Sequence, residues 1–178
     1  MEETKRRRFI IRAVLEGEVD VQDAPPVPEY PYPLAQVESQ SEHYKWSIQG
    51  NHVHLENIAA GGGATRYLNL QTGEMSSTGS IINNKPEWFS IPADTEAVLS
   101  FTNVVNTRNC TVNFRKANSS QSSEFSQVLA NGQDAEVTKT FAADESVSCL
   151  FCYLSGFDAA NATLDFDVEF TVGGERYF

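Results

Sequence analysis

The residues with the clearest potential for chemistry are His52, His54 and Glu56, in the stretch HVHLEN. In an extended strand every second side chain points to the same face, so these three side chains would lie together on one face. Two imidazoles from one chain make an incomplete metal site, whereas three chains around an axis would supply six nitrogens, enough for an octahedral transition metal. The alternative interpretation is an ordinary polar strand face.

Motifs that support hydrolysis or group transfer are missing from the sequence. It contains no G-x-S-x-G, no glycine-rich phosphate loop and no H-E-x-x-H. Cys149 and Cys152 form a C-x-x-C, but three residues apart on a strand they would point to opposite faces. We interpret them as small buried hydrophobic residues. We therefore expect no catalytic residues and no enzymatic activity.

Two tryptophans could serve as sugar-stacking platforms. Trp46 lies in the strand-like run HYKWSIQ and Trp88 in the run EWFSI. Exposed aromatic rings on a sandwich would resemble the ligand-stacking residues of jelly-roll carbohydrate-binding modules. The alternative interpretation is that both rings are core residues, because large aromatic side chains dominate the buried area of such folds.

The element that must organise the fold is the stretch 162–172, ATLDFDVEFTV, in which apolar and polar residues alternate strictly. One face of such a strand is buried and the other meets water, so a second sheet must cover it. Between Pro86 and Phe178 the sequence predicts eight short strands separated by turn residues, which is typical of a sandwich or jelly roll. These strands are 87–91, 96–104, 110–117, 124–130, 135–141, 146–154, 162–172 and 175–178.

The predicted fold class is all-β, with a C-terminal, jelly-roll-like antiparallel β-sandwich at 85–178. Three segments precede it: an N-terminal arm at 1–24, a proline-rich spacer at 25–40 and a small β module at 41–84. Five of the seven prolines lie in the spacer, which favours extended polyproline II. The small module has too little apolar content to be stable alone, so we expect it to pair with copies of itself or to pack on the sandwich.

The N-terminal arm combines basic and apolar residues, and we interpret it as a docking segment for an acidic partner surface. A solvated terminus is the alternative, but the apolar residues would then have little to pack against. The residues that we expect to dock are Arg6, Arg7, Arg8, Phe9, Ile11 and Arg12.

The net charge of −11 disfavours general nucleic-acid binding, because the protein surface would repel phosphate. No apolar run approaches the roughly 20 residues of a membrane-spanning helix. The apolar run from Phe9 is interrupted by Arg12 and Glu16, so it does not fit a signal peptide, and the odd number of cysteines fits production in a cytoplasm.

The layout of a basic arm, a proline spacer and a β-sandwich resembles that of virion accessory proteins of tailed bacteriophages, such as head fibres and capsid decoration proteins. The His52 and His54 pair is similar to H-x-H pairs in trimeric phage fibres and spikes, which bind iron on the three-fold axis. The resemblance implies a structural role in the virion, with the chain made in the host cytoplasm.

The same resemblance implies the partners. The arm would dock on capsid or other virion proteins, the chain would form a homo-oligomer (a trimer is favoured and a dimer stays open), and the sandwich would attach to a host or to surface glycans. No cofactor is expected apart from the axial metal. The alternative function is a carbohydrate-binding jelly-roll module of a surface or secreted protein.

Overall fold

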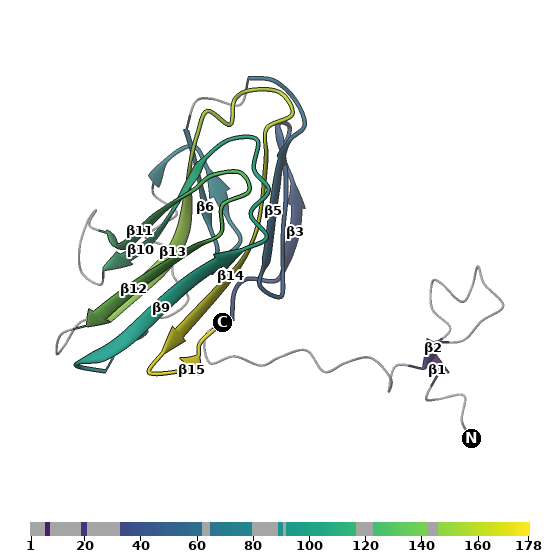
Figure 1. The fold of residues 1–178 in the computed structure, drawn as a ribbon. Helices are drawn as coiled ribbons and strands as arrows, with labels where there is room; N and C mark the ends of the chain where they lie inside the picture. The colour runs from purple at the N-terminus through teal and green to yellow at the C-terminus, as the bar shows by residue number, and fades with distance from the viewer. Residues whose placement is uncertain are drawn as a thin grey trace.

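The computed structural model describes residues 33–61, 65–79, 92–116, 123–141 and 146–178, together with strand residues at 6–7, 19–20 and 89–90. The elements along these residues are all β-strands. Two antiparallel sheets face each other as the layers of a β-sandwich (Figure 1). The predicted all-β class with an antiparallel sandwich is confirmed. No helix within the described residues is long and apolar enough to cross a membrane.

The first layer is built around β14 (Thr163–Val172), and we call it the β14 sheet. Its strand order is β12-β9-β14-β5-β4-β3, with β15 paired to β14. The other strands are β3 (Val37–Gln40), β4 (Tyr44–Gln49), β5 (His52–Asn57), β9 (Thr95–Thr102), β12 (Ala135–Phe141) and β15 (Glu175–Arg176).

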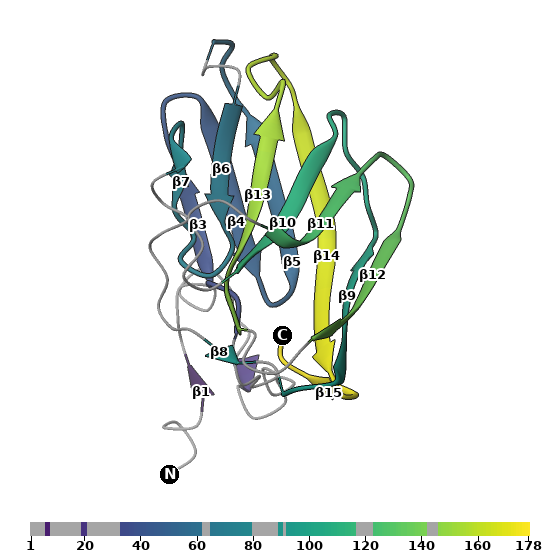
Figure 2. The ribbon, with the colours of Figure 1, turned by 90° about the vertical axis from the view of Figure 1, so that its left-hand side faces the viewer.

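The second layer is built around β13 (Ser146–Ser155), and we call it the β13 sheet. Its strand order is β11-β10-β13-β6-β7, with β8 paired to β13. Figure 2 looks onto this sheet, with the β14 sheet behind it. Its other strands are β6 (Thr65–Asn69), β7 (Met75–Ser76), β8 (Phe89–Ser90), β10 (Cys110–Lys116) and β11 (Ser123–Leu129).

The alternation predicted for 162–172 is confirmed, and it explains the position of the core. β14 lies between β5 and β9, and every second residue of it is buried while the residues between are partly exposed. Phe166 of β14 meets Phe101 of β9 edge-on, with ring centroids 5.7 Å apart. The inward-facing side chains of both sheets form one apolar cluster between the layers.

The structure corrects the prediction of a separate β module at 41–84. β4 and β5 belong to the β14 sheet, and β6 and β7 belong to the β13 sheet. Trp46, Leu55 and Leu68 are buried in the same apolar cluster as Phe166. The physical reason is that β14 and β13 each need neighbouring strands and an opposite layer to bury their apolar faces. The low apolar content of 41–84 therefore no longer argues for an oligomer.

The predicted proline spacer at 25–40 is also too long at its C-terminal end. Leu34 is buried, the backbone N–H of Ala35 donates to the carbonyl of Leu70 at 2.9 Å, and β3 pairs with β4. Residues beyond Pro33 have the N–H groups that a sheet ladder requires, so they join the sandwich as its edge strand. The other prolines of the spacer lie outside the described residues.

Little of the predicted arm at 1–24 lies in the described residues. β1 (Arg6–Arg7) pairs with β2 (Val19–Asp20) in a two-stranded sheet that shares no strand with the two sandwich sheets. Arg8, Phe9, Ile11 and Arg12 lie outside the described residues, as do the side chains of Arg6 and Arg7. Docking by this arm stays a prediction.

Candidate functional site

The outer face of the β14 sheet carries a group of histidine, aspartate and asparagine side chains, which we call the His–Asp cluster. Along β5 the apolar residues are buried and His52, His54 and Glu56 lie on the outer face, as predicted. In the antiparallel register, Asp165 of β14 lies opposite His54, and Asp167 lies opposite His52. Opposed residues share a face, so each imidazole meets a carboxylate. The cluster comprises His52, His54, Asn103, Asp165 and Asp167.

The cluster consists of two short histidine–aspartate pairs, which a longer contact connects. His54 Nδ1 lies 2.7 Å from Asp165 Oδ1, and His52 Nδ1 lies 2.7 Å from Asp167 Oδ1. His52 Nε2 approaches Asp165 Oδ1 to 3.7 Å, and Asn103 Nδ2 donates to Asp167 Oδ2 at 2.7 Å. An ionised carboxylate accepts hydrogen bonds and donates none, so Nδ1 is the donor in both histidines. In the neutral form, Nε2 of each ring then carries no hydrogen, and that of His52 faces the Asp165 carboxylate.

The surroundings of Asp167 in the cluster change its pKa. Partial burial raises its pKa, but the hydrogen bonds from Asn103 and His52 and the charge of His52 together outweigh that effect. The net result is a pKa of Asp167 below its ordinary value. The carboxylate is therefore held in its charged form on a face where its side chain is 24% exposed.

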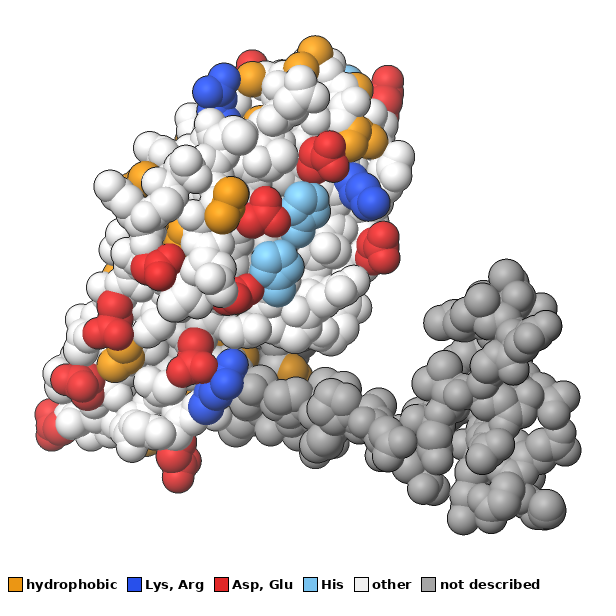
Figure 3. Space-filling model, turned by 45° about the vertical axis from the view of Figure 1, so that its right-hand side comes forward, with side chains coloured by type: hydrophobic (Ala, Val, Ile, Leu, Met, Phe, Trp, Pro, Cys, Tyr) orange, Lys and Arg blue, Asp and Glu red, His pale blue; other side chains and the backbone are white. Residues whose placement is uncertain are grey.

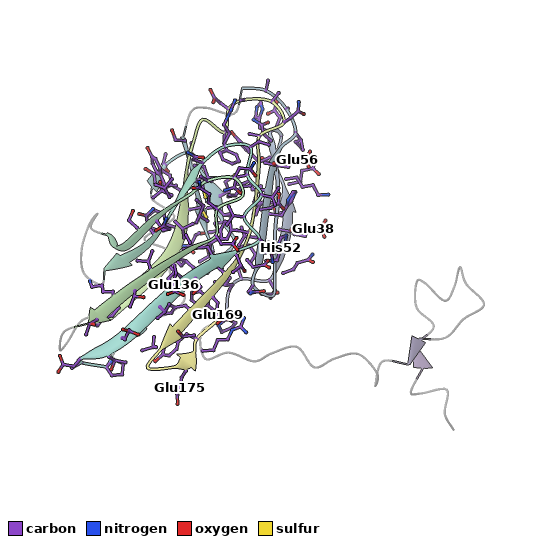
Figure 4. All side chains as sticks on the ribbon, viewed as in Figure 1. Glu38, His52, Glu56, Glu136, Glu169 and Glu175 are labelled. Atoms are coloured by element: carbon purple, nitrogen blue, oxygen red, sulfur yellow. The ribbon has the colours of Figure 1, made fainter. Side chains whose placement is uncertain are left out.

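The surroundings of the cluster are open and polar. The His52 side chain is 47% exposed, and Lys45 lies opposite Glu56 across β4 and β5. Figure 3, which shows this side of the molecule, has two histidines next to each other with carboxylates close by. Further along the same sheet, Arg176 Nη1 lies 3.1 Å from Glu169 Oε2. The labelled carboxylates in Figure 4 mark this face from Glu56 at one end to Glu175 at the other.

A row of residues across β4, β5 and β14, which includes two members of the cluster, has the residue types of a hydrolytic triad. Ser47 of β4 lies opposite His54, which in turn lies opposite Asp165. A triad needs the serine hydroxyl bonded to the imidazole and donors for an oxyanion. Within the described residues, the Ser47 hydroxyl makes no hydrogen bond to His54. We therefore interpret this row as a polar part of the sheet face.

The predicted metal role of His52 and His54 stays a prediction. No three His, Cys, Asp or Glu side chains of the described ranges are grouped so that they could hold a metal ion. Both Nδ1 atoms are already bonded to aspartates. Such carboxylate–histidine pairs orient the remaining nitrogen of metal-bound imidazoles. A single chain thus offers two Nε2 atoms, and an axial metal would need further copies of the chain.

The two tryptophans predicted as stacking residues have different outcomes. Trp46 is 8% exposed, and its indole N–H donates to the carbonyl of Gly73 at 2.9 Å. Most of the Trp46 ring therefore belongs to the core, as the alternative interpretation of a core residue predicted. Trp88 lies outside the described residues.

A small pocket lies at the edge of the sandwich, beside β4 and β7, and we call it the edge pocket. Its volume is about 200 Å³. The exposed edge of Trp46 contributes to its wall, so this tryptophan is both a core residue and a pocket residue. The lining residues are Ser41, Glu42, His43, Tyr44, Trp46, Met75, Ser76 and Ser77.

The described cysteines belong to the core. Cys110 and Cys152 are buried on adjacent strands. Burial raises the pKa of the Cys152 thiol, and the neighbouring Cys110 raises it further. A protonated, buried thiol is a poor nucleophile. The interpretation of Cys152 as a small hydrophobic residue is confirmed, and the side chain of Cys149 lies outside the described residues.

No known protein family matches the sequence, and none of the curated proteins matches it. Among solved structures, the chain is similar to the CBM22-1 xylan-binding domain of Xyn10C from Paenibacillus barcinonensis. That match has a TM-score of 0.31 and 9% identity, and it covers 84% of this chain and 97% of the other. A likeness of this degree carries no argument about the function of this chain.

Sequence reasoning missed the partners of the histidines. The alternation of 162–172 predicts only that Asp165 and Asp167 lie on the face that meets water, whereas in the structure they also accept hydrogen bonds from His54 and His52. The alternating patterns of HVHLEN and LDFDVE indicate that each strand has a polar face, one with histidines and the other with aspartates. These patterns predict a contact between the histidines and the aspartates only when the pairing of β5 with β14 is known.

Proposed function

We propose that this chain is a structural virion protein, a head fibre or capsid decoration protein, whose N-terminal arm docks on the capsid and whose sandwich projects outward for attachment. The observation that supports this best is how the described strands are divided. β1 and β2 pair only with each other, whereas β3 to β15 build the sandwich. The docking segment and the projecting body would thus be separate parts of one chain.

Charge supports the same division. Arg6, Arg7 and Arg8 lie in the arm, while the whole chain has a net charge of −11. A basic arm on an otherwise acidic protein favours contact with an acidic surface and keeps the sandwich itself from adhering to it. The arm would therefore decide where the protein binds.

Mass spectrometry of purified virus particles from cells that carry the gene tests the proposal. We expect the full-length chain in the particles, and we expect a chain without residues 1–24 to fold but to be lost from them. Replacing Arg6, Arg7 and Arg8 with Gln should weaken incorporation. The matched control is Lys45→Gln, which removes a positive charge from the exposed face of the sandwich. Absence of the full-length chain from particles would overturn the proposal.

The oligomeric state provides a second test, because a fibre requires association. Light scattering of the purified chain should give the mass of a trimer, or of a dimer, built from 19.7 kDa chains. A monomer at micromolar concentration would contradict the fibre form of the proposal.

The second candidate is a carbohydrate-binding module of a surface or secreted protein. The edge pocket beside Trp46 is the observation that favours it. Sugar binding by a chain that is absent from virus particles would support this candidate over the first.

A further inference from the structure

We propose that the edge pocket binds one sugar ring of a glycan. This inference rests on the attachment role in the proposed function and deepens it by naming the ligand class and the site. Two observations carry it: the construction of the pocket between the two sheets, and the division of its lining into an apolar wall and a polar rim.

The pocket is held from both layers of the sandwich. The Trp46 indole of β4 donates to the carbonyl of Gly73, in the turn that leads into β7. This hydrogen bond links the β14 sheet to the β13 sheet beside the pocket. The volume of the pocket is about 200 Å³. The pocket is small and open to solvent, and one sugar ring is the part of a glycan that we assign to it.

The wall of the pocket presents carbon atoms, because the polar groups of its Tyr44 and Trp46 side chains are hydrogen-bonded to backbone carbonyls. The Tyr44 hydroxyl donates to the carbonyl of Phe157 at 3.1 Å, and the Trp46 N–H donates to Gly73. Met75, partly buried against the core, adds a polarisable apolar side chain. A sugar ring has an apolar C–H face that can pack on such a wall.

The rim of the pocket offers acceptors for sugar hydroxyls. Glu42 is exposed, and within the described residues its carboxylate has no hydrogen bond or ion pair. His43 Nδ1 lies 3.1 Å from the carbonyl of Ala59. A carbonyl only accepts, so Nδ1 carries the hydrogen and Nε2 is the acceptor of the neutral ring. The exposed Ser77 hydroxyl can both donate and accept.

Another aromatic surface competes with the pocket for this role. Tyr67 and Tyr153 lie opposite each other on the outer face of the β13 sheet, next to Phe151. Their rings meet at 71° with centroids 5.3 Å apart, so they pack against each other. Phe151 is only 6% exposed. Among the side chains that the structure describes, this surface has no unpaired carboxylate like that of Glu42 on the pocket rim, and we therefore assign the sugar to the pocket.

The experiment is a titration of the ¹⁵N-labelled full chain with the methyl glycosides of glucose, galactose, xylose and N-acetylglucosamine, followed by NMR. The protein has two tryptophans, so the spectrum holds two indole N–H signals. Trp88→Phe removes one of them and leaves that of Trp46. We expect at least one glycoside to shift the Trp46 indole signal together with the amides of Glu42 and Ser77.

Three variants sharpen the result. Ser77→Leu fills the pocket from its exposed rim, and Glu42→Gln removes its charged acceptor. Each should weaken binding about tenfold or more. For Ser77→Leu the reason is the lost space, and for Glu42→Gln it is that a hydrogen bond to a charged group contributes about 1.5–3 kcal/mol. Glu175→Gln is the matched control, because Glu175 is an exposed carboxylate at the opposite end of the sandwich from Glu56 (Figure 4). It should leave the affinity unchanged.

Three outcomes would overturn the inference: no shift with any glycoside, shifts confined to Tyr67 and Tyr153, or equal shifts with methylammonium. The last outcome would identify a cation site, which a carboxylate beside an aromatic ring also suits. The particle experiment does not depend on sugar binding. If the pocket binds no sugar, the virion proposal therefore stands unchanged. If the chain binds sugar but is absent from virus particles, the sugar site stands and the virion proposal is wrong.

Discussion

His54 and Asp165 are 111 residues apart in the sequence, and their side chains meet at 2.7 Å between Nδ1 and Oδ1. The contact exists because β5 and β14 are neighbours in antiparallel register. The same register brings His52 to Asp167. One pairing of two strands therefore assembles both His–Asp pairs on the outer face of the β14 sheet, and Asn103 joins them from the end of β9.

The ionisation of Asp167 should depend on Asn103. Asn103→Gly removes the Nδ2 donor and keeps the positive φ of 54° that this position adopts. We expect the pKa of Asp167 to rise toward its ordinary value, as measured by NMR titration of the carboxyl carbon. The control is Asn161→Gly, at another positive-φ asparagine. An unchanged pKa of Asp167 in the Asn103 variant would contradict the assigned cause.

Acid should weaken the fold partly through Asp167. Its pKa is lower in the folded than in the unfolded chain, so its contribution to stability is present above the unfolded pKa. That contribution is lost as the pH falls through the folded pKa. Urea unfolding between neutral and acidic pH should show a smaller decline for Asp167→Asn than for the parent chain. Glu175→Gln should decline as the parent does, and identical slopes in all three chains would refute the prediction.

Phe166 should be among the most costly residues to truncate. Its ring is fully buried and packs edge-on against Phe101. Phe166→Ala should lower the free energy of unfolding by about 3–5 kcal/mol, because it removes buried area and leaves a cavity. Phe166→Leu should lose less and stay folded for comparison. A loss below about 1 kcal/mol in chemical denaturation would mean that the core is not packed as described.

Gly73 should be essential for the edge strand β3. A Cβ at this position would lie 2.7 Å from Val37 Cγ1, and its φ is +77°. Gly73→Ala should cost more than about 1 kcal/mol of stability and expose the β3 amides to hydrogen exchange. Gly50→Ala is the matched control, because Gly50 has a φ of +61° and open space around its Cβ position. Equal losses of stability in both variants would show that the contact with Val37 is not the cause of the loss in Gly73→Ala.

The predicted axial metal can be tested by elemental analysis of the purified oligomer. A trimer with this site should contain one transition metal ion per three chains, and both His52→Ala and His54→Ala should remove it. His43→Ala is the control, since His43 lines the edge pocket instead of the cluster. A metal-free oligomer prepared in the presence of iron or zinc would end the prediction.

The sequence by itself determined the fold class and the faces of the strands. Alternation along 162–172 and along HVHLEN is a local, period-two property, so it predicts which side chains are buried and which share an outer face. The burial of Phe166 and the outward position of His52 and His54 were predictable for this reason.

The tertiary structure alone decided which faces meet. Many strands of similar alternation can pair with one another, and the choice depends on register, twist and the burial of the whole molecule. For that reason the sequence did not indicate that Asp165 lies opposite His54, or that β4 to β7 complete both sheets. It also could not place Trp46, whose ring lies in the core while its edge lines a pocket between two layers.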